Sequence, residues 1–213
     1  MTPKPCVRGT GSSSDCLAWL QAQTTKSIDL ILTDPPYGLN VAGTGKFRSN
    51  NRAFSPSSWD TSRPSRNYFN EMRRISHNQI IWGGNYFADF LPPSRCWIAW
   101  WKNDRLPRLN FADCELAWTS FDRPAYVYNC RWRSSVRDSK ESLYPHPTQK
   151  PLAVMRWCVE QFTEPDALIA DPFLGTGTTA VAATALGRRC IGIESDREYF
   201  DIAARRLSAL PCF

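Results

Sequence analysis

The chain has 213 residues, of which 42% are hydrophobic and 13% aromatic, so it can form one packed domain or one domain with a sizeable insertion. Its formal net charge of +6 favours a polyanionic partner, and residues 1–6 lack the apolar stretch of a signal peptide. No apolar stretch approaches the roughly 20 residues that span a bilayer, and the eight cysteines and two histidines lack metal-ligand spacing, so we expect a cytoplasmic protein with reduced thiols and no metal.

Two predicted elements precede the most informative motif of the chain. Residues 15–20 are predicted to form a short helix after a polar start. Residues 28–33 are mostly Ile and Leu, which predicts one buried strand. The strand ends at Asp34-Pro-Pro-Tyr37, where two prolines prevent a helix or a ladder from continuing. This motif is therefore predicted to be a stiff loop at the C-terminal end of a strand, the edge at which open α/β sheets bind ligands.

The residue types in this loop suit chemistry at the exocyclic amine of a nucleic-acid base. The carboxylate of Asp34 and the carbonyl of Pro35 can accept the two N–H bonds of such an amine, and the ring of Tyr37 can stack on a base that has left the helix. From these residues alone, the alternative interpretation is a strand followed by a Pro-Pro turn with a surface carboxylate.

Positive charge gathers near this loop. Residues 40–76 contain seven Lys or Arg and two Asp or Glu, whereas residues 165–213 contain five basic and six acidic residues. Residues 39–66 form a long polar stretch, and residues 102–145 interleave basic with aromatic side chains, which suits phosphate contact and base stacking. An ordinary solvated loop is the alternative. The residues predicted to contact nucleic acid are Lys46, Arg48, Arg52, Arg105, Arg108, Arg131 and Arg133.

The middle of the chain alternates short elements. The sequence predicts helices at 68–75 and 85–91, strands at 79–84 and 95–102, a hairpin of strands at 114–121 and 126–132, and a helix that ends near residue 162. His146-Pro-Thr-Gln-Lys150-Pro opens that last helix, where free backbone amides and the lysine favour an anionic ligand group. A well-capped core helix is the alternative.

A glycine-rich turn follows near the C-terminal end. The sequence predicts a strand at 167–171, a helix at 180–186, a strand at 189–194 and an amphipathic helix at 197–210 that packs on the core. Gly175 and Gly177 allow the backbone to approach a ligand closely, and Glu194 ends the next strand, where a carboxylate can bind ribose hydroxyls. The turn lacks the lysine of a P-loop. The glycines alone leave a nicotinamide-dependent oxidoreductase open, but that class does not explain Asp34-Pro-Pro-Tyr37.

Four motifs in this order resemble those of the amino-group DNA methyltransferases with the β-type motif order, in particular small phage and prophage members. The motifs are Asp34-Pro-Pro-Tyr37, Trp82-Gly-Gly-Asn85, His146-Pro-Thr-Gln-Lys150-Pro and Asp171-Pro-Phe-Leu-Gly175-Thr-Gly177-Thr-Thr. The resemblance implies a doubly wound, mostly parallel α/β sheet of the Rossmann-like class I methyltransferase type. It further implies a single domain over residues 1–213, with residues 39–66 and 102–145 as inserted DNA-contacting segments for target recognition.

The resemblance also implies S-adenosylmethionine as cofactor, DNA as partner, and a monomer or homodimer. The implied catalytic residues are Asp34, Pro35, Pro36 and Tyr37. The implied cofactor-binding residues are Asp171 for the methionine amino group, Phe173 beside the methionine, Gly175, Gly177 and Thr178 in the turn, Glu194 for the ribose, His146 and Lys150 for the methionine part, and Asp15 near the adenine. An N-cap role for Asp15 is the alternative.

The target atom follows from family analogy. An aspartate at the first position of the catalytic motif is commoner among adenine-N6 enzymes, so adenine N6 is preferred and cytosine N4 is the alternative. Methylation of RNA or of a protein amide remains open, and so does a non-catalytic DNA-binding remnant. The sequence shows no restriction-nuclease module, and a partner restriction enzyme stays undetermined.

Overall fold

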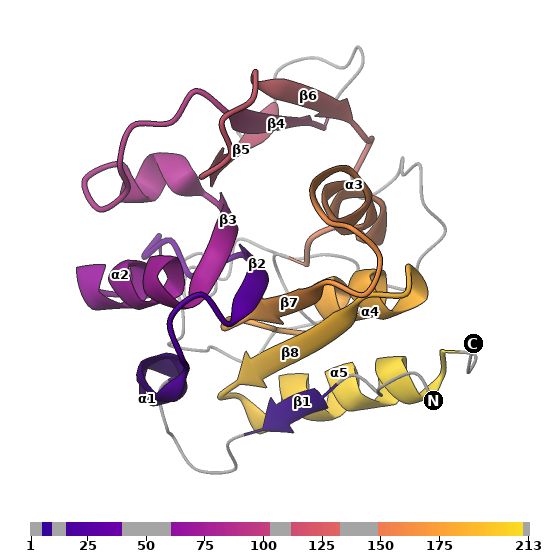
Figure 1. Ribbon diagram of the computed structural model, residues 1–213. Coiled ribbons are helices and arrows are strands. Elements are labelled where there is room, and N and C mark those ends of the chain that lie inside the picture. Colours follow the sequence, from indigo (N-terminus) through magenta and orange to yellow (C-terminus); the bar gives the residue numbers. More distant parts are fainter. Residues whose placement is uncertain (1–5, 10–15, 40–60, 103–111, 133–148, 211–213) are drawn as a thin grey trace.

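The computed structural model describes residues 6–9, 16–39, 61–102, 112–132 and 149–210. Its strands are β1 (Cys6–Gly9), β2 (Ile28–Thr33), β3 (Ser76–Trp82), β4 (Trp97–Trp101), β5 (Cys114–Thr119), β6 (Tyr126–Asn129), β7 (Leu168–Asp171) and β8 (Arg189–Glu194). Its helices are α1 (Cys16–Ala22), α2 (Arg66–Ile75), the 3-10 turn η1 (Gly84–Phe87), α3 (Leu152–Phe162), α4 (Thr178–Ala185) and α5 (Arg197–Ser208). These strands form one sheet in the order β1-β8-β7-β2-β3-β5-β4-β6 (Figure 1).

The sheet is mostly parallel. The pairs β1–β8, β8–β7, β7–β2 and β2–β3 are all parallel, and only β5 among the described strands runs against its neighbours β3 and β4. Beyond β5, the edge strand β6 is again parallel to β4. This arrangement confirms the predicted doubly wound, mostly parallel α/β sheet.

The strand order reverses between β2 and β7. From β2 the chain passes through α2 to β3 on one side, whereas β7 lies on the other side of β2 and leads through α4 to β8. In an open α/β sheet, the crevice beyond the C-terminal ends of the strands at such a reversal is the usual ligand site. The predicted catalytic motif follows β2 and the predicted cofactor turn follows β7, so both motifs stand at this crevice.

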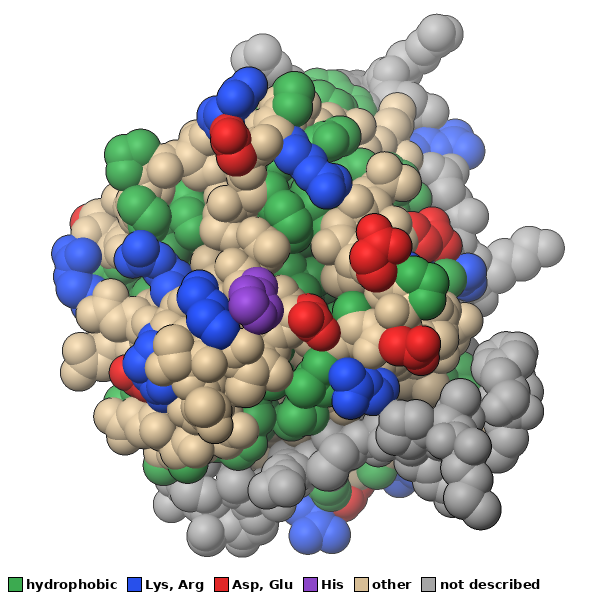
Figure 2. All heavy atoms as spheres, in the orientation of Figure 1, with side chains coloured by type: hydrophobic (Ala, Val, Ile, Leu, Met, Phe, Trp, Pro, Cys, Tyr) green, Lys and Arg blue, Asp and Glu red, His purple; other side chains and the backbone are tan. Residues whose placement is uncertain are grey.

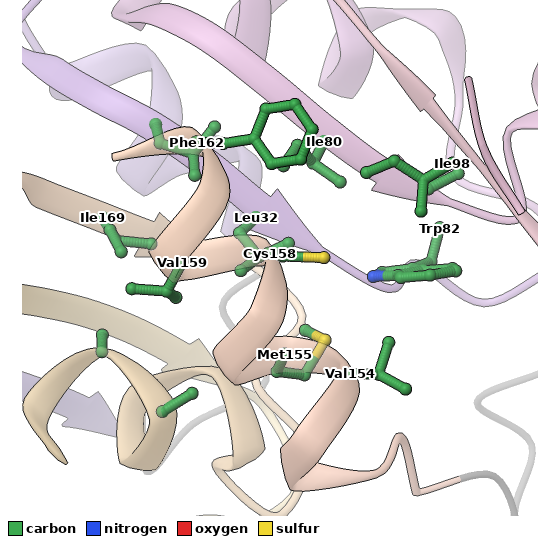
Figure 3. Close-up of a cluster of buried hydrophobic side chains, with 14 of the residues drawn as sticks. Leu32, Ile80, Trp82, Ile98, Val154, Met155, Cys158, Val159, Phe162 and Ile169 are labelled. Carbon is green, nitrogen blue, oxygen red and sulfur yellow. The ribbon is translucent and has the colours of Figure 1, made fainter. Parts of the chain in front are cut away.

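Helices bury both faces of the sheet, which explains why the central strands are apolar at consecutive positions. In β2, Leu30 and Leu32 belong to a core cluster with α3, α4 and α5, whereas Ile31 belongs to a second cluster with α1 and α2. Figure 3 shows the first cluster, in which residues of α3 such as Cys158 and Phe162 lie against side chains of the sheet. The two clusters hold β2 rigidly, and its C-terminal end therefore has a fixed position.

Most predicted elements are present within one to four residues of their expected bounds, but the hairpin of 114–121 and 126–132 is wrong. β4 lies between β5 and β6, and it pairs with the first antiparallel and with the second parallel. The physical reason is that β5 uses both of its edges, one for β3 and one for β4, so β6 has only the outer edge of β4 left. The helix predicted at 85–91 is reduced to η1, which starts after Gly83 in the left-handed conformation.

None of the helices in the described residues is both long and apolar enough to cross a membrane. The same residues contain no cluster of three or more His, Cys, Asp or Glu side chains that is arranged to hold a metal ion.

Candidate active site

The C-terminal ends of β2 and β7 are joined through their side chains. Thr33 Oγ1 donates a hydrogen bond to Asp171 Oδ1 at 2.6 Å, and both residues are buried. The two strands are paired in register, with Ile31 opposite Ala170. The predicted catalytic loop, which starts at Asp34, and the predicted cofactor turn, which starts after Asp171, therefore begin at neighbouring points of one edge.

Tyr37 folds back onto the carboxylate of its own motif. Its hydroxyl donates to Asp34 Oδ1 at 2.6 Å, and its ring stacks on Tyr86 with centroids 4.7 Å apart and an interplanar angle of 20°. The ring of Phe87 lies in a T-shaped arrangement with it, with centroids 6.1 Å apart. Burial raises the pKa of Tyr37 well above its usual range, and the Asp34 and Glu115 carboxylates raise it further, so the phenol keeps its proton and acts as a donor.

Gly83 makes room for this tyrosine. A Cβ atom at position 83 would lie 2.1 Å from Cε1 of Tyr37, and the backbone there has a φ of +67°, in the left-handed region. Packing against Tyr37 thus explains the first glycine of the second predicted motif, whereas a Cβ at Gly84 would instead meet Trp118.

Lys150 connects the catalytic loop to two further charged residues. Its Nζ atom donates to Asp34 Oδ2 at 2.5 Å and to the Tyr37 hydroxyl at 3.2 Å, and it lies 2.9 Å from Glu115 Oε2. The other oxygen of Glu115, Oε1, accepts from Lys102. The four charges alternate in sign along the series Asp34, Lys150, Glu115, Lys102. The side chain of Lys150 is only 6% exposed, whereas those of Asp34 and Glu115 are 22% and 24% exposed.

The two carboxylates of this cluster titrate differently because they have different partners. Burial raises the pKa of Asp34, and the single ammonium of Lys150 opposes this shift only in part because Glu115 adds negative charge nearby. Burial also acts to raise the pKa of Glu115, but the two ammonium groups of Lys150 and Lys102 outweigh it and hold that pKa at about 2. Burial acts to lower the pKa of Lys150, and its two carboxylate neighbours more than offset this, so the ammonium stays charged.

The glycine turn after β7 is shaped by its own backbone and by β8. Gly175 and Gly177 have φ values of 55° and 86°, which side-chain-bearing residues rarely adopt. The amide of Gly175 donates to Glu194 Oε2 at 2.7 Å, and Glu194 Oε1 accepts from the amide of Asp196 at 2.8 Å. Burial raises the pKa of Glu194, and these amide hydrogen bonds lower it in part. The predicted ribose-binding carboxylate therefore stands at the turn and is fixed in orientation.

Asp171 is a buried carboxylate with only neutral partners. It is 2% exposed, and its Oδ1 accepts from Thr33 and from the Phe173 amide, the latter at 3.1 Å. Burial raises its pKa to about 6, against the effect of hydrogen bonds that include one from Thr179. Within the described residues, no lysine or arginine forms an ion pair with it. A cationic group of a ligand would supply the missing countercharge.

Arg206 was not among the residues predicted for the site. It is buried in α5. Its guanidinium donates to the carbonyl of Thr176 at 2.7 Å and to Thr178 Oγ1 at 3.1 Å. These hydrogen bonds connect the glycine turn to α5. The sequence contains a weak signal for it, because position 206 lies three residues after the buried Ala203, on the same face of the helix.

The structure describes only part of the predicted site. It brings together Asp34, Tyr37, Lys150, Asp171 and the glycine turn; Pro35 is buried and Pro36 half-buried in the same loop. Lys150 was predicted to bind the cofactor, whereas its ammonium contacts the catalytic motif. Phe173 lies with its ring centroid 5.9 Å from that of Tyr68. Residues outside the described part are Asp15, Lys46, Arg48, Arg52, Arg105, Arg108, Arg133 and His146.

The structure describes about half of the predicted DNA-contacting segment 102–145 and a smaller part of the segment 39–66. Residues 61–66 lie at and before the start of α2, and β5 and β6 belong to the sheet although they fall inside residues 102–145. Arg131 is exposed just after β6. A DNA-contacting role for these segments stays a prediction.

A pocket of about 680 Å³ lies at the opposite edge of the sheet. It is lined by residues at the start of β3, before β4 and after β5, among them His77, Arg95 and Asp122. Figure 2 shows lysine and arginine side chains close to the only histidine coloured on this face. None of the predicted motif residues lines this pocket, so it is separate from the candidate active site.

The chain is similar in sequence to known DNA methylases. The sequence profile of a DNA methylase family matches residues 92–205. The type II methyltransferase M.HinfI of Haemophilus influenzae is 27% identical over 242 residues, which cover 91% of this chain and 66% of M.HinfI. The type II methyltransferase M2.DpnII of Streptococcus pneumoniae is 27% identical over 236 residues, which cover 92% of this chain and 88% of M2.DpnII.

Solved structures extend the likeness to the whole fold. A complex of M1.HpyAVI with S-adenosylmethionine is 25% identical with a TM-score of 0.58, and the match covers 94% of this chain and 98% of the other. The cytosine-N4-specific PvuII DNA methyltransferase shares the fold, with 17% identity, a TM-score of 0.61 and coverage of 95% and 88%. The predicted family, its fold and its use of S-adenosylmethionine are confirmed at the level of the family. Because the profile matches more than half of the sequence, the chain belongs to the DNA methylase family.

Proposed function

We propose that this protein transfers a methyl group from S-adenosylmethionine to the exocyclic amine of a base flipped out of DNA, with adenine N6 as the preferred target. The observation that carries the proposal is the hydrogen bond between Thr33 and Asp171. It supports the proposal because it joins the residue before Asp34, whose carboxylate suits an amine, to Asp171, whose carboxylate suits a cationic group of a cofactor.

The described residues fit S-adenosylmethionine. Asp171 has no cationic partner among them and suits the ammonium of the methionine part, while Glu194 at the tip of β8 suits the ribose hydroxyls. The left-handed glycines of the turn leave space for close approach of a ligand to the backbone. When bound, the cofactor supplies an electrophilic methyl group on a sulfonium.

The residues of the catalytic loop orient the amine and remove its proton. Asp34 and the Pro35 carbonyl accept the two amine hydrogens, which directs the nitrogen lone pair away from the loop. Once the nitrogen has gained the methyl group it carries an extra proton, and Asp34 is the nearest base to receive it. Because burial raises the pKa of Asp34, its carboxylate takes up a proton more readily than an exposed one would.

The flipped base needs an aromatic partner, and Tyr37 was predicted for this role. One face of its ring is stacked on Tyr86. We infer that the base either uses the remaining exposed surface of Tyr37 or displaces Tyr86, since base–aromatic stacking contributes on the order of 1–3 kcal/mol. Removing a base from the duplex costs a few kcal/mol, which such contacts offset.

The test is expression in a methylation-free bacterial host followed by single-molecule sequencing of the host DNA. We expect N6-methyladenine at a defined short sequence, and N6-methyl-2′-deoxyadenosine among the nucleosides of hydrolysed DNA by mass spectrometry. If N4-methylcytosine is found instead, methyl transfer to an exocyclic amine is supported, but the target is cytosine N4 and not adenine N6. DNA without any methylated amine, with active methylation of RNA in competition assays, would overturn the proposal. Because bacterial DNA lies in the cytoplasm, we infer that compartment for the activity.

A further inference from the structure

Lys150 occupies the carboxylate that the proposed reaction requires for the target amine. Its Nζ atom donates to Asp34 Oδ2 at 2.5 Å, and the remaining oxygen, Oδ1, accepts from the Tyr37 hydroxyl at 2.6 Å. We propose that Glu115 is a positioning residue that takes over Lys150 when the amine of the target base replaces it on Asp34. This inference rests on the proposed function, because it concerns the same site and the same amine.

The conflict between Lys150 and the amine is one of charge rather than of hydrogen-bond number. A carboxylate has about four lone-pair positions, so Asp34 can accept from a third donor. The amine nitrogen, however, becomes positive as it takes the methyl group, and an ammonium bound to the same carboxylate raises the energy of that positive charge. Lys150 in its observed position therefore disfavours the reaction, and catalysis is faster if its charge moves away from Asp34.

Glu115 is positioned to pair with the ammonium of Lys150. Its Oε2 atom is buried and lies 2.9 Å from Nζ of Lys150, so the ammonium already lies within ion-pair distance of both carboxylates. A rotation at the end of the Lys150 side chain, away from Asp34, would leave the ammonium paired with this carboxylate. The ammonium would then remain paired throughout, which matters because an unpaired buried charge is strongly unfavourable.

Glu115 itself is held in place. Its Oε1 atom is engaged by Lys102, and its backbone is fixed in β5 opposite Trp100 of β4. Lys150, by contrast, lies in the connection before α3. We therefore expect the ammonium of Lys150 to move while Glu115 keeps its position, because Glu115 is held by Lys102 and by the pairing of β5 with β4.

Glu71 is a matched control for a substitution at Glu115. Its side chain is 23% exposed, compared with 24% for Glu115, and it forms an ion pair with Arg74 at 2.7 Å within α2, away from the catalytic motif. Glu71→Gln therefore removes a charge from a side chain of nearly equal exposure, together with an ion pair of similar length, without contacting Lys150.

The experiment measures single-turnover methyl transfer from labelled S-adenosylmethionine to DNA of a methylation-free host, at saturating DNA and cofactor, in four proteins. These are wild type, E71Q, E115Q and the double variant E115Q with K150M. We expect E115Q to slow transfer by at least about tenfold, because Lys150 then has Asp34 as its only carboxylate partner in the cluster, while E71Q stays within about twofold of wild type. The affinity of E115Q for S-adenosylmethionine, measured by calorimetry, should stay within about threefold of wild type.

The double variant distinguishes positioning from a structural role. If Glu115 acts by holding Lys150 away from Asp34, removal of the ammonium should make the double variant faster than E115Q. A double variant that is as slow as E115Q or slower would overturn the inference, and so would an E115Q enzyme as fast as wild type. Should E115Q fail to fold, E115D replaces it, and a smaller loss that K150M relieves is the expected result. An inactive wild type would instead refute the proposed function.

Discussion

The hydroxyl of Thr33 donates to Asp171 Oδ1 at 2.6 Å and joins two residues that are 138 positions apart in the sequence. This bond ties the strand that precedes the catalytic loop to the strand that precedes the cofactor turn. It also satisfies one oxygen of a carboxylate that is almost completely buried. The site is therefore assembled from two distant parts of the chain, and four predictions test how its parts work.

Stability should depend on pH through Asp171. Burial raises its pKa from 3.8 to about 6, so the folded protein binds this proton more tightly than the unfolded chain. The contribution of Asp171 to the free energy of unfolding is thus fully present below about pH 4 and is lost as pH rises through about 6, by up to about 3 kcal/mol. Chemical denaturation of wild type and Asp171→Asn at pH 4.5 and 7.5 should show wild type losing stability relative to the variant. A difference that stays constant between these pH values would contradict the prediction.

Asp34→Ala should abolish methyl transfer with little effect on cofactor binding. The variant cannot hold the amine or take its proton, so we expect a loss of at least about 10³-fold in turnover. Affinity for S-adenosylmethionine should change by less than about threefold, because Asp171 and the glycine turn are unaltered. Asp89→Ala is the control, since it removes an exposed carboxylate paired with Arg63. Normal turnover in Asp34→Ala would refute the catalytic role.

Gly83→Ala should impair activity by displacing Tyr37. The added methyl group would lie 2.1 Å from the tyrosine ring, in addition to the strain of a φ of +67°. Gly187→Ala is a matched control, because position 187 has a φ of +73° and no heavy atom within 4 Å of the added methyl group. Both variants should lose about 1 kcal/mol of stability from the backbone, but only Gly83→Ala should also slow methyl transfer by about tenfold or more. Equal activities of the two variants would show that the position of Tyr37 is unimportant.

Arg206→Met should weaken both the fold and cofactor binding. It leaves the Thr176 carbonyl without its guanidinium donor and removes support from the glycine turn, so we expect a loss of about 2–4 kcal/mol of stability. Calorimetry should show reduced affinity for S-adenosylmethionine at a temperature where the variant is folded. Arg205→Met changes the exposed neighbour and should have little effect on either quantity. An unchanged affinity in folded Arg206→Met would show that Arg206 supports the fold but does not affect cofactor binding.

The parts of the site that follow a single strand could be predicted from sequence. The apolar run 28–33 has the same bounds as β2, and the loop at Asp34 and the turn at Gly175 follow their strands as expected. Local patterns suffice here because each motif is attached directly to the element that positions it.

The parts that depend on strand order could not be predicted in this way. Glu115 meets Lys150 only because β5 enters the sheet antiparallel between β3 and β4, which periodicity does not specify. The wrong hairpin has the same origin, since proximity in sequence favoured a β5–β6 pair over the observed parallel pair of β4 and β6. A glutamate inside an otherwise apolar strand was the available signal for Glu115, because a charge at such a position is normally paired.

The pairing of β2 with β7 also affects synthesis of the protein. When β2 and β3 have just emerged from the ribosome, one edge of β2 has no partner strand. Its partner on that edge is β7, whose Ile169 and Ala170 lie opposite Leu30 and Ile31 and are synthesised much later. Contacts between such distant residues form late and slow the folding of a domain. The catalytic loop is translated long before the glycine turn, so the two halves of the site can meet only after β7 and β8 have been synthesised.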